Sequence, residues 1–308
     1  MVHHFAKLQG LGNDFVFFDG LSTPLELTSQ QVALLCDRHF GIGADGVIVV
    51  APSPRPECRA YMHYINSDGT LAQMCGNGIR CFTKFLVDRG YLPQQDSSYW
   101  ADTLRGPLCI SYTVDDQGCM NFASVDMDEP ILDPTLIPST IAATTIYRDT
   151  PCVIEAPLES PWGIFSFTLV SMGNPHAVTF IDDFEALPDT CFIGGEGIKK
   201  TLETLDVARI GTFFESHPAF PEKANIEFAT HQGDALAMRV FERGCGETLA
   251  CGTGTCATLV AAVLTQRSNR KNTVHLLGGN LVIQWDEATN HITMTGPAAQ
   301  SFIGEISI

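Results

Sequence analysis

The sequence contains one short motif twice, Cys-Gly-x-Gly, at residues 75–78 and again at residues 251–254. Each copy leads directly into a run of apolar residues with helical spacing, and a strand-like segment and a polar turn precede each copy. One such motif alone is typical of a tight turn at the start of a helix. Two copies in matching surroundings indicate an internal duplication of one structural unit.

The similarity extends upstream of both motifs. Asn66 precedes the first cysteine by nine residues, and Glu242 precedes the second cysteine by nine residues. A stretch rich in Pro and Asp at residues 126–140 is typical of a connection between domains. We therefore expect two halves, residues 1–128 and residues 129–295, and a cleft between them would bring the two helix starts together.

Short strand-like runs dominate the rest of the chain. They are predicted at residues 15–19, 46–50, 60–65, 177–182, 224–230, 235–242 and 280–285. A first helix is predicted over 28–40, where Thr28 or Ser29 can cap the first turn and Leu34, Leu35 and Phe40 lie on one face.

Two further helices are predicted to begin at the motifs, over 76–91 and 252–267. The second is apolar almost all round, which is typical of a helix inside a protein. Each half is therefore expected to wrap its strands around one buried helix, with a cysteine at the N-terminus of that helix.

The charge of the chain excludes some classes of partner. The formal net charge is −17, from 18 Lys and Arg against 35 Asp and Glu. A surface this acidic repels phosphate groups, so we expect neither nucleic acid nor an anionic membrane as a partner. No run approaches the roughly 18 apolar residues of a membrane span. The N-terminus lacks the pattern of a secretory signal, which favours a cytoplasmic location.

The cysteines do not have the spacing of a disulfide framework or a metal site. The chain has 11 cysteines and no Cys-x-x-Cys pair, which argues against a zinc ribbon and a thioredoxin-like motif. We expect no bound metal. Cys81 and Cys256 lie within the predicted helices and are interpreted as buried apolar residues, whereas the pattern leaves the role of Cys245 open.

A cysteine at a helix start has a specific chemical environment. The helix N-terminus presents unpaired N–H groups and a partial positive charge, and this field is expected to lower the pKa of a thiol. Two such termini together could hold a carboxylate. With one sulfur on each face of the adjacent carbon, a thiolate could remove a proton and a thiol could return one to the other face. This pattern predicts a racemase or epimerase that needs no pyridoxal cofactor.

At these residues the chain resembles a known family, the diaminopimelate epimerases. Six blocks in the family's order cover nearly the whole chain: LQGLGNDFVFFD, CDRHFGIGADGVIVV, YINSDGTLAQMCGNGIRC, SMGNPHAVTF, HPAFPEKANIEF and ERGCGETLACGTG. The resemblance implies interconversion of LL-2,6-diaminopimelate and meso-diaminopimelate without a cofactor, in lysine and peptidoglycan-precursor biosynthesis. It also implies a homodimer.

The fold implied by this resemblance is of the α/β class, α+β type. It has two pseudo-symmetric domains, each a mixed and mostly antiparallel, barrel-like sheet wrapped around a central helix. The C-terminal strand 296–308 is expected to join the first domain.

The resemblance also implies roles for individual residues. Cys75 and Cys251 would be the acid/base pair, with His176 and Glu242 orienting or assisting the two sulfurs. The reacting carboxylate would be held by the N–H groups of Gly76, Asn77, Gly252 and Thr253. The other substrate contacts would be made by Asn13 near the reacting amino group, and by Asn66, Asn174, Asn225, Glu242 and Arg243. Arg243 is consistent with this from its chemistry, because its guanidinium can bind a carboxylate through two hydrogen bonds.

The chain departs from the family pattern at several positions. Gly46 stands where some members have Gln, Leu71 and Gln73 stand where acidic residues are common, and Cys245 often corresponds to Ala. The segment 183–223 is longer than usual. None of these departures lies within the two Cys-Gly-x-Gly motifs, so they affect substrate contacts more than mechanism.

Two alternatives from different classes stay open at this point. One is a proline or hydroxyproline racemase, or an isomerase of the phenazine-pathway type, on the same scaffold. The other is a protein without this activity that uses its thiols for redox chemistry or metal binding. Arg243 together with three asparagines favours a substrate with a second polar end, and the lack of close Cys/His spacing disfavours a metal site.

Overall fold

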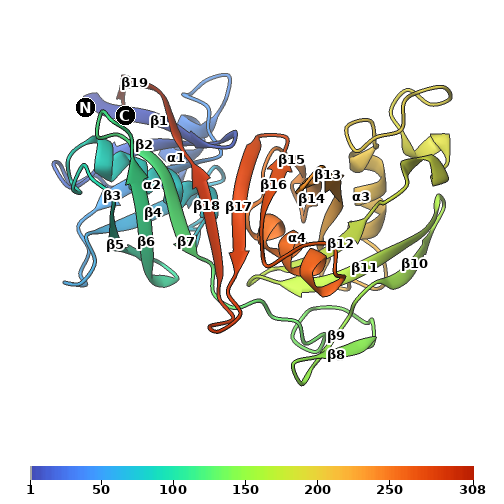
Figure 1. Cartoon of the computed structure of the whole chain (residues 1–308). Coiled ribbons are helices and arrows are strands. Elements are labelled where there is room, and N and C mark those ends of the chain that lie inside the picture. The colour runs from blue at the N-terminus through green and yellow to red at the C-terminus, as the bar shows by residue number, and fades with distance from the viewer. Residues whose placement is uncertain (1) are drawn as a thin grey trace. The chain divides into compact units, whose positions relative to one another are not determined.

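The computed structural model describes residues 2–308, and these form two compact units (Figure 1). The first unit comprises the chain up to Asp126 together with Thr295–Ile308. The second unit comprises Met127–Met294. Both ends of the chain therefore belong to the first unit. None of the helices in residues 2–308 is long and apolar enough to cross a membrane.

The first unit is a mixed sheet with two helices. Its elements are β1 (Val2–Gly10), β2 (Asn13–Asp19), α1 (Ser29–Cys36), β3 (Gly46–Ala51), β4 (Ala60–Asn66), α2 (Gly76–Asp88), β5 (Ser97–Thr103), β6 (Gly106–Val114), β7 (Met120–Asp126) and β19 (Ala299–Ser307). Neighbouring strands pair antiparallel, except β2–β3 and β4–β5, which are parallel. These two pairs are the ones joined through a helix, as a parallel connection requires. Strand β19 pairs antiparallel with β1.

The second unit contains the remaining elements. They are β8 (Thr145–Tyr147), β9 (Thr150–Cys152), β10 (Ala156–Ser160), β11 (Gly163–Ser171), β12 (Pro175–Phe180), the 3-10 turns η1 (Phe184–Ala186) and η2 (Asp189–Cys191), α3 (Val207–Glu215), β13 (Asn225–Gln232), β14 (Ala235–Glu242), β15 (Gly246–Thr248), α4 (Gly252–Leu264), β16 (Lys271–Leu276) and β17 (Gly279–Trp285). Strand β18 (Ile292–Pro297) begins in the second unit and ends in the first.

The two units share one order of strand pairings. In the second unit β11–β12 is antiparallel, β12–β13 is parallel across α3, β13–β14 is antiparallel, β14–β16 is parallel across α4, and β16–β17 is antiparallel. The strands β1 to β6 follow the same sequence, with α1 and α2 in the places of α3 and α4. The duplication predicted from the two motifs is therefore confirmed, and the fold is of the expected α+β type.

The register of the first parallel pair aligns the units residue by residue. In the first unit Phe15 pairs with Gly46 across β2–β3, and in the second unit His176 pairs with Asn225 across β12–β13. Position 15 therefore corresponds to position 176. Two residues further along the second strand of each pair, Ile48 corresponds to Glu227.

The turn before each of these strands is also equivalent. Gly12 has a φ of 87° and Gly173 has a φ of 91°, a conformation that favours glycine. Asn13 follows the first glycine and Asn174 follows the second. The two asparagines therefore occupy the same place in the duplicated frame.

Each unit packs its strands against one central helix, as expected. Helix α2 contacts β1, β2, β3, β7 and β19, while α4 contacts β11 to β14, β16 and β17. In α4 every side chain from Cys256 to Ala262 is buried, which agrees with its nearly uniform apolar sequence.

The helix predicted over 28–40 is shorter in the structure. It begins with a capping box, in which Thr28 accepts from the backbone of Gln31 and the Gln31 side chain accepts from Thr28. It ends at Cys36, because the Asp37 carboxylate accepts the next free N–H groups in a turn.

The prediction that Leu34, Leu35 and Phe40 share one buried face of this helix is also partly wrong. Leu35 is buried, but Leu34 is 54% exposed and Phe40 is 85% exposed. Phe40 lies beyond the end of the helix, so the helical spacing on which the prediction rested does not apply to it.

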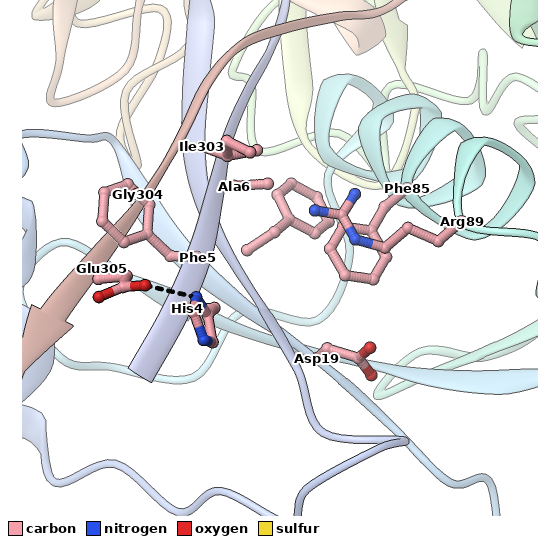
Figure 2. A pocket seen from close by; sticks show the side chains of 10 residues that line it. His4, Phe5, Ala6, Asp19, Phe85, Arg89, Ile303, Gly304 and Glu305 are labelled. Carbon is pink, nitrogen blue, oxygen red and sulfur yellow. Dashed lines mark ion pairs between the residues drawn. The ribbon is translucent and has the colours of Figure 1, made fainter. Parts of the chain in front are cut away.

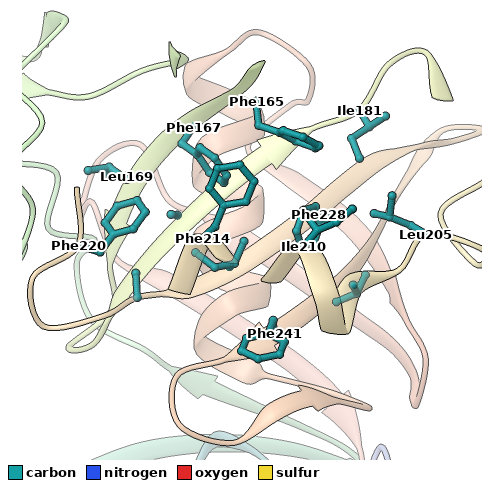
Figure 3. Close-up of a cluster of buried hydrophobic side chains, with 14 of the residues drawn as sticks. Phe165, Phe167, Leu169, Ile181, Leu205, Ile210, Phe214, Phe220, Phe228 and Phe241 are labelled. Atoms are coloured by element: carbon teal, nitrogen blue, oxygen red, sulfur yellow. The ribbon is translucent and has the colours of Figure 1, made fainter. Parts of the chain in front are cut away.

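The second unit has a core rich in phenylalanine (Figure 3). Phe167 on β11 contacts Phe214 on α3 edge to face, with ring centroids 4.8 Å apart. Phe165 and Phe228 extend the same cluster. Helix α3 comes from the segment 183–223 and contacts β13, β14 and β15, so this segment contributes directly to the core of the second unit.

Candidate active site

Cys75 is the N-cap residue of α2, and the helix begins at the next residue as predicted. Its Sγ accepts a hydrogen bond from the N–H of Gly78 at 3.5 Å and donates one to Oδ1 of Asn13 at 3.6 Å. The side chain is partly exposed. The N–H groups of Gly76 and Asn77 lie in the first turn, where helix geometry offers them no carbonyl partner within the helix.

A hydrogen-bonded network holds Asn13 beside Cys75. The Asn13 amide nitrogen donates to Asp45 at 2.6 Å, and its oxygen also accepts from the side chain of Asn77 at 3.1 Å. Arg38 in turn forms an ion pair with Asp45 and with Asp14. Burial acts to raise the pKa of Asp14, but hydrogen bonds from Arg38 and Lys7 lower it below its usual value. Asp45 was not among the predicted site residues.

Cys251 is the N-cap residue of α4 and repeats the geometry of Cys75. Its Sγ accepts from the N–H of Gly254 at 3.4 Å and lies 3.5 Å from the hydroxyl of Thr253. Gly252 and Thr253 supply the N–H groups of the first turn. Unlike Cys75, Cys251 is only 5% exposed.

The pKa of Cys251 differs from the expectation. The helix start was expected to lower it, but in the structure the pKa of this thiol lies well above its usual range. Burial is the largest cause, and the nearby carboxyl groups of Glu242 and Glu227 add to it. These effects outweigh the hydrogen bonds from Thr253 and Gly254, so Cys251 is a thiol at neutral pH.

Asn66 and Glu242 end equivalent strands, β4 and β14. The Asn66 amide donates to the hydroxyl of Thr70 at 3.1 Å, within the turn that leads toward Cys75. Glu242 accepts from the hydroxyl of Thr248, within the turn that leads toward Cys251. Both side chains are partly exposed.

Asn225 and Arg243 are linked by a hydrogen bond. The Asn225 amide is 3% exposed, and it donates to the carbonyl of Pro175 at 2.7 Å and accepts from the backbone N–H of Arg243 at 2.9 Å. The Arg243 side chain is exposed and donates to the carbonyl of Glu222. Within residues 2–308 its guanidinium forms no ion pair, so it has no carboxylate partner of its own in the chain.

His176 lies in a fully buried polar pair. Its Nδ1 is 2.6 Å from Oε1 of Glu227, and its Nε2 is 3.0 Å from Oδ1 of Asn174. Neither His176 nor Glu227 is exposed. Burial raises the pKa of Glu227, with a further contribution from Glu242, although His176 acts to lower it. Glu227 was not among the predicted site residues.

The structure thus groups the predicted residues around two helix starts. Asn13, Cys75 and Asn77 are in direct contact in the first unit. In the second unit Asn174 contacts His176, and Asn225 contacts Arg243. Glu242 acts on Cys251 through its charge.

Comparison with known proteins identifies the family. The sequence profile of diaminopimelate epimerase matches two stretches of the chain, residues 5–132 and 168–300. The chain belongs to the diaminopimelate epimerase family. Each matched stretch contains one Cys-Gly-x-Gly motif, in agreement with the duplication.

Relatives that are named diaminopimelate epimerases align with nearly the full length of this chain. The chain is 45% identical over 302 residues to a diaminopimelate epimerase of Synechococcus sp. strain JA-3-3Ab, covering 97% of this chain and 96% of the relative. It is 42% identical over 305 residues to that of Methanococcus maripaludis strain C5, covering 99% of each.

Solved structures share the fold at low sequence identity. A hydroxyproline epimerase from Agrobacterium vitis superposes with a TM-score of 0.67 at 14% identity, covering 100% of this chain and 93% of the other. A phenazine biosynthesis protein from Bacillus anthracis superposes with a TM-score of 0.66 at 16% identity, covering 100% of both chains. These similarities show the fold alone.

The departure from the family pattern at Gly46 has a structural reason. A Cβ at this position would lie 2.6 Å from the Tyr64 ring and 2.7 Å from the carbonyl oxygen of Ile65. No side chain can be added there unless the Tyr64 ring and the backbone at Ile65 both move. The other departures, Leu71, Gln73 and Cys245, are exposed.

One pocket of about 300 Å³ lies in the first unit, away from the candidate site (Figure 2). It is lined by β1, β19 and the C-terminal part of α2, where Arg89 lies over the ring of Phe85. Cys75 is at the other end of α2, about 15 Å away at a rise of 1.5 Å per residue. The pocket contains no cysteine and none of the predicted site residues, so the epimerase chemistry does not belong there.

Proposed function

We propose that the protein interconverts LL-2,6-diaminopimelate and meso-diaminopimelate by moving a proton between the two faces of one α-carbon. The observation that carries this proposal is the pair of equivalent cysteines, Cys75 and Cys251, each capping the central helix of one half of a duplicated chain. Membership of the diaminopimelate epimerase family supports the substrate. The reaction supplies precursors for lysine and for peptidoglycan.

In the proposed mechanism both helix starts act on one substrate molecule. The N–H groups of Gly76, Asn77, Gly252 and Thr253 hold the carboxylate of the reacting centre. When the α-proton leaves, negative charge develops on this carboxylate, and the same N–H groups stabilise it without reorganising. Asn13 lies beside Cys75, where it can accept from the α-ammonium group.

The two cysteines exchange roles during one turnover. In one direction Cys75 first loses to solvent the proton that it donates to Asn13 in the structure. The resulting thiolate removes the α-proton and becomes a thiol again, while the Cys251 thiol gives its proton to the opposite face and becomes a thiolate. The configuration at the α-carbon inverts, and the reverse reaction uses the sulfurs in the opposite roles. The raised pKa of Cys251 supports its assignment as the thiol in the free enzyme.

The non-reacting end of the substrate is proposed to bind polar groups from both units. Arg243 has an exposed guanidinium without an ion-pair partner in residues 2–308, which suits a second carboxylate. Asn66, Asn174, Asn225 and Glu242 would contact the remaining polar groups of this end. His176 and Glu242 would orient or assist the sulfurs.

We propose that the protein acts as a homodimer in the cytoplasm. The mechanism requires Cys75 and Cys251 in reduced form, which a reducing compartment maintains. All 11 cysteines are free in the structure. Sedimentation velocity would test the dimer, which should have twice the chain mass of 33.5 kDa.

A deuterium-exchange experiment tests the function. Purified protein is incubated in D₂O with LL-diaminopimelate and, separately, with trans-4-hydroxy-L-proline, and the α-position is followed by NMR. Solvent deuterium should enter diaminopimelate as the meso isomer forms, and should not enter hydroxyproline. Exchange into hydroxyproline alone would instead assign the chain to the racemase branch of this fold.

A further inference from the structure

The two units differ where strands β2 and β3, and their equivalents β12 and β13, contact the central helices. In the first unit the equivalent positions hold Phe15 and Ile48, and both are buried and apolar. In the second unit they hold His176 and Glu227, both with no exposed surface. The duplicated frame therefore shows that two apolar side chains can fill these positions. The polar pair needs another explanation.

Glu227 is an unfavourable residue for stability at this place. Its Oε2 is buried and has no hydrogen-bond partner in residues 2–308. A buried carboxyl oxygen without a partner lowers the stability of the folded protein. The helix above it is shaped to leave room, because a Cβ on Gly254 would lie 2.6 Å from Oε1 of Glu227. An aliphatic residue would avoid both problems, as Ile48 does in the first unit.

The contacts of His176 determine where its protons lie. Oε1 of Glu227 faces Nδ1, and Oδ1 of Asn174 faces Nε2. Burial raises the pKa of Glu227, which favours a shared proton between Glu227 and Nδ1 over an isolated carboxylate. The protonated Glu227 carboxyl donates to Nδ1, so in the neutral ring Nε2 carries the hydrogen and donates it to the Asn174 oxygen.

This arrangement fixes the orientation of the Asn174 amide. Its oxygen is held by His176, so its nitrogen is directed away from the pair. Within residues 2–308 the Asn174 amide nitrogen has no hydrogen-bond partner. Asn174 is also partly exposed, whereas His176 and Glu227 are buried. The amide nitrogen is therefore a donor available to a ligand.

We propose that Glu227 is a positioning residue for substrate binding: acting through His176, it holds the Asn174 amide with its nitrogen ready to donate to a carboxylate oxygen of the substrate. This rests on the proposed function and deepens it. Glu227 itself does not touch the substrate. Its effect is to select one orientation of Asn174, which without it could present either an acceptor or a donor.

The test compares two variants of nearly equal size, Glu227→Gln and Glu227→Leu. The Gln side chain keeps a donor toward Nδ1 of His176, so Nε2 still donates to Asn174. The Leu side chain packs as Ile48 does in the first unit but gives Nδ1 no partner. Wild-type protein is first shown to exchange deuterium into diaminopimelate, so that failure of the function itself is recognised before the variants are compared.

We expect the Leu variant to raise KM roughly 10- to 100-fold with kcat changed less than about threefold, because an orientation used for binding is lost. The Gln variant should have a KM within about threefold of wild type. Melting temperatures of both variants are measured alongside, because a merely structural role would lower stability without separating KM from kcat.

Nitrogen-15 NMR of the histidines gives a readout that does not depend on activity. In the wild type and the Gln variant, Nε2 of His176 should be protonated, and in the Leu variant this preference should be lost. The signals are assigned by their absence in His176→Gln. An unchanged KM in the Leu variant, an equal loss in the Gln variant, or an unprotonated Nε2 in the wild type would each overturn the proposal.

Discussion

The two halves of this chain have the same strand order and the same cysteine-capped helix, but different surroundings for the cysteine. Cys75 is partly exposed and donates to the Asn13 amide, and the half that contains it has apolar Phe15 and Ile48 where the other half has His176 and Glu227. Cys251 is buried, and carboxyl groups raise its pKa. A proton can pass from one face of a carbon to the other only if one sulfur starts as base and the other as acid. Duplication gives each half a cysteine at the start of its central helix, and the two sulfurs then differ in burial and in the carboxyl groups near them.

The largest expected effect comes from removing either sulfur. Cys75→Ala and Cys251→Ala should each lower the rate of epimerisation by at least about a thousandfold, because general acid or base catalysis is lost on one face. The melting temperature should change little for Cys75→Ala, whose side chain is partly exposed. Epimerisation is measured by the interconversion of the two isomers on chiral chromatography.

Cys109→Ala is the matched control, because Cys109 is exposed on β6 and has no proposed role. It should retain wild-type turnover. Normal turnover in either of the first two variants would refute the two-sulfur mechanism.

A pair of glycine substitutions probes what lies under each helix. In Gly254→Ala the new Cβ would lie 2.6 Å from the Glu227 carboxyl, which is held by its hydrogen bond with His176. In Gly78→Ala the new Cβ would lie 3.3 Å from the terminal methyl group of Ile48. Gly254→Ala should lower the free energy of unfolding by about 2–3 kcal/mol through overpacking. Gly78→Ala should stay within about 1 kcal/mol of wild type, since the higher helix propensity of alanine offsets a tight contact.

Chemical denaturation of both glycine variants measures these free energies. If both variants lost the same free energy of unfolding, the Glu227 side chain would move aside as easily as Ile48 does. In that case the comparison between the two halves would lose its structural basis.

Alkylation compares the reactivity of the two thiols directly. At neutral pH iodoacetamide should modify Cys75 at least about tenfold faster than Cys251, because Cys251 is buried and stays protonated. The rate at Cys251 should rise as the pH increases above 9. Mass spectrometry of the digested protein measures both rates in one sample. Faster labelling of Cys251 would reverse the assignment of the resting acid.

The smallest effect is a pH-dependent change in stability at Glu227. In the unfolded chain this carboxyl ionises near its usual value of 4.5, and in the folded chain its pKa is higher. Wild-type stability therefore falls as the pH rises from 4.5 through the folded pKa, whereas Glu227→Gln has no such dependence. The Gln variant should be more stable than wild type at pH 7, and the difference should disappear below pH 4.5.

Thermal unfolding across this pH range provides the measurement. A constant difference between wild type and the Gln variant at every pH would show that Glu227 ionises as it does in the unfolded chain.

The starts of the two central helices and the duplication of the fold could be predicted from the residues, because these features depend on local sequence patterns. Apolar spacing and the Cys-Gly-x-Gly motifs located the starts of α2 and α4, and their repetition predicted the duplication. The end of α1 was missed because the side chain of Asp37 closes the helix, whereas the apolar spacing continues to Phe40.

The polar pair under α4 could not be predicted in the same way. In the run from Asn225 to Phe228, alternation places Ile226 and Phe228 inward and Glu227 outward. The strand is buried on both faces, because the phenylalanine cluster with α3 covers Phe228 and α4 lies against Glu227, so the alternation rule fails. The expected low pKa of Cys251 failed for a related reason, since the helix start was known but the burial and the neighbouring carboxyl groups were not.

The first unit cannot be completed until β19 is present, and this has a consequence for synthesis on the ribosome. Residues 127–294 emerge before the strand that closes against β1, so the second unit has all its parts first, the reverse of the usual N-terminal-first order. Strand β1 therefore has one edge without its partner strand while residues 127–294, more than half of the chain, are synthesised. An exposed edge of this kind can pair with other chains, so a chaperone that covers it would act during this interval.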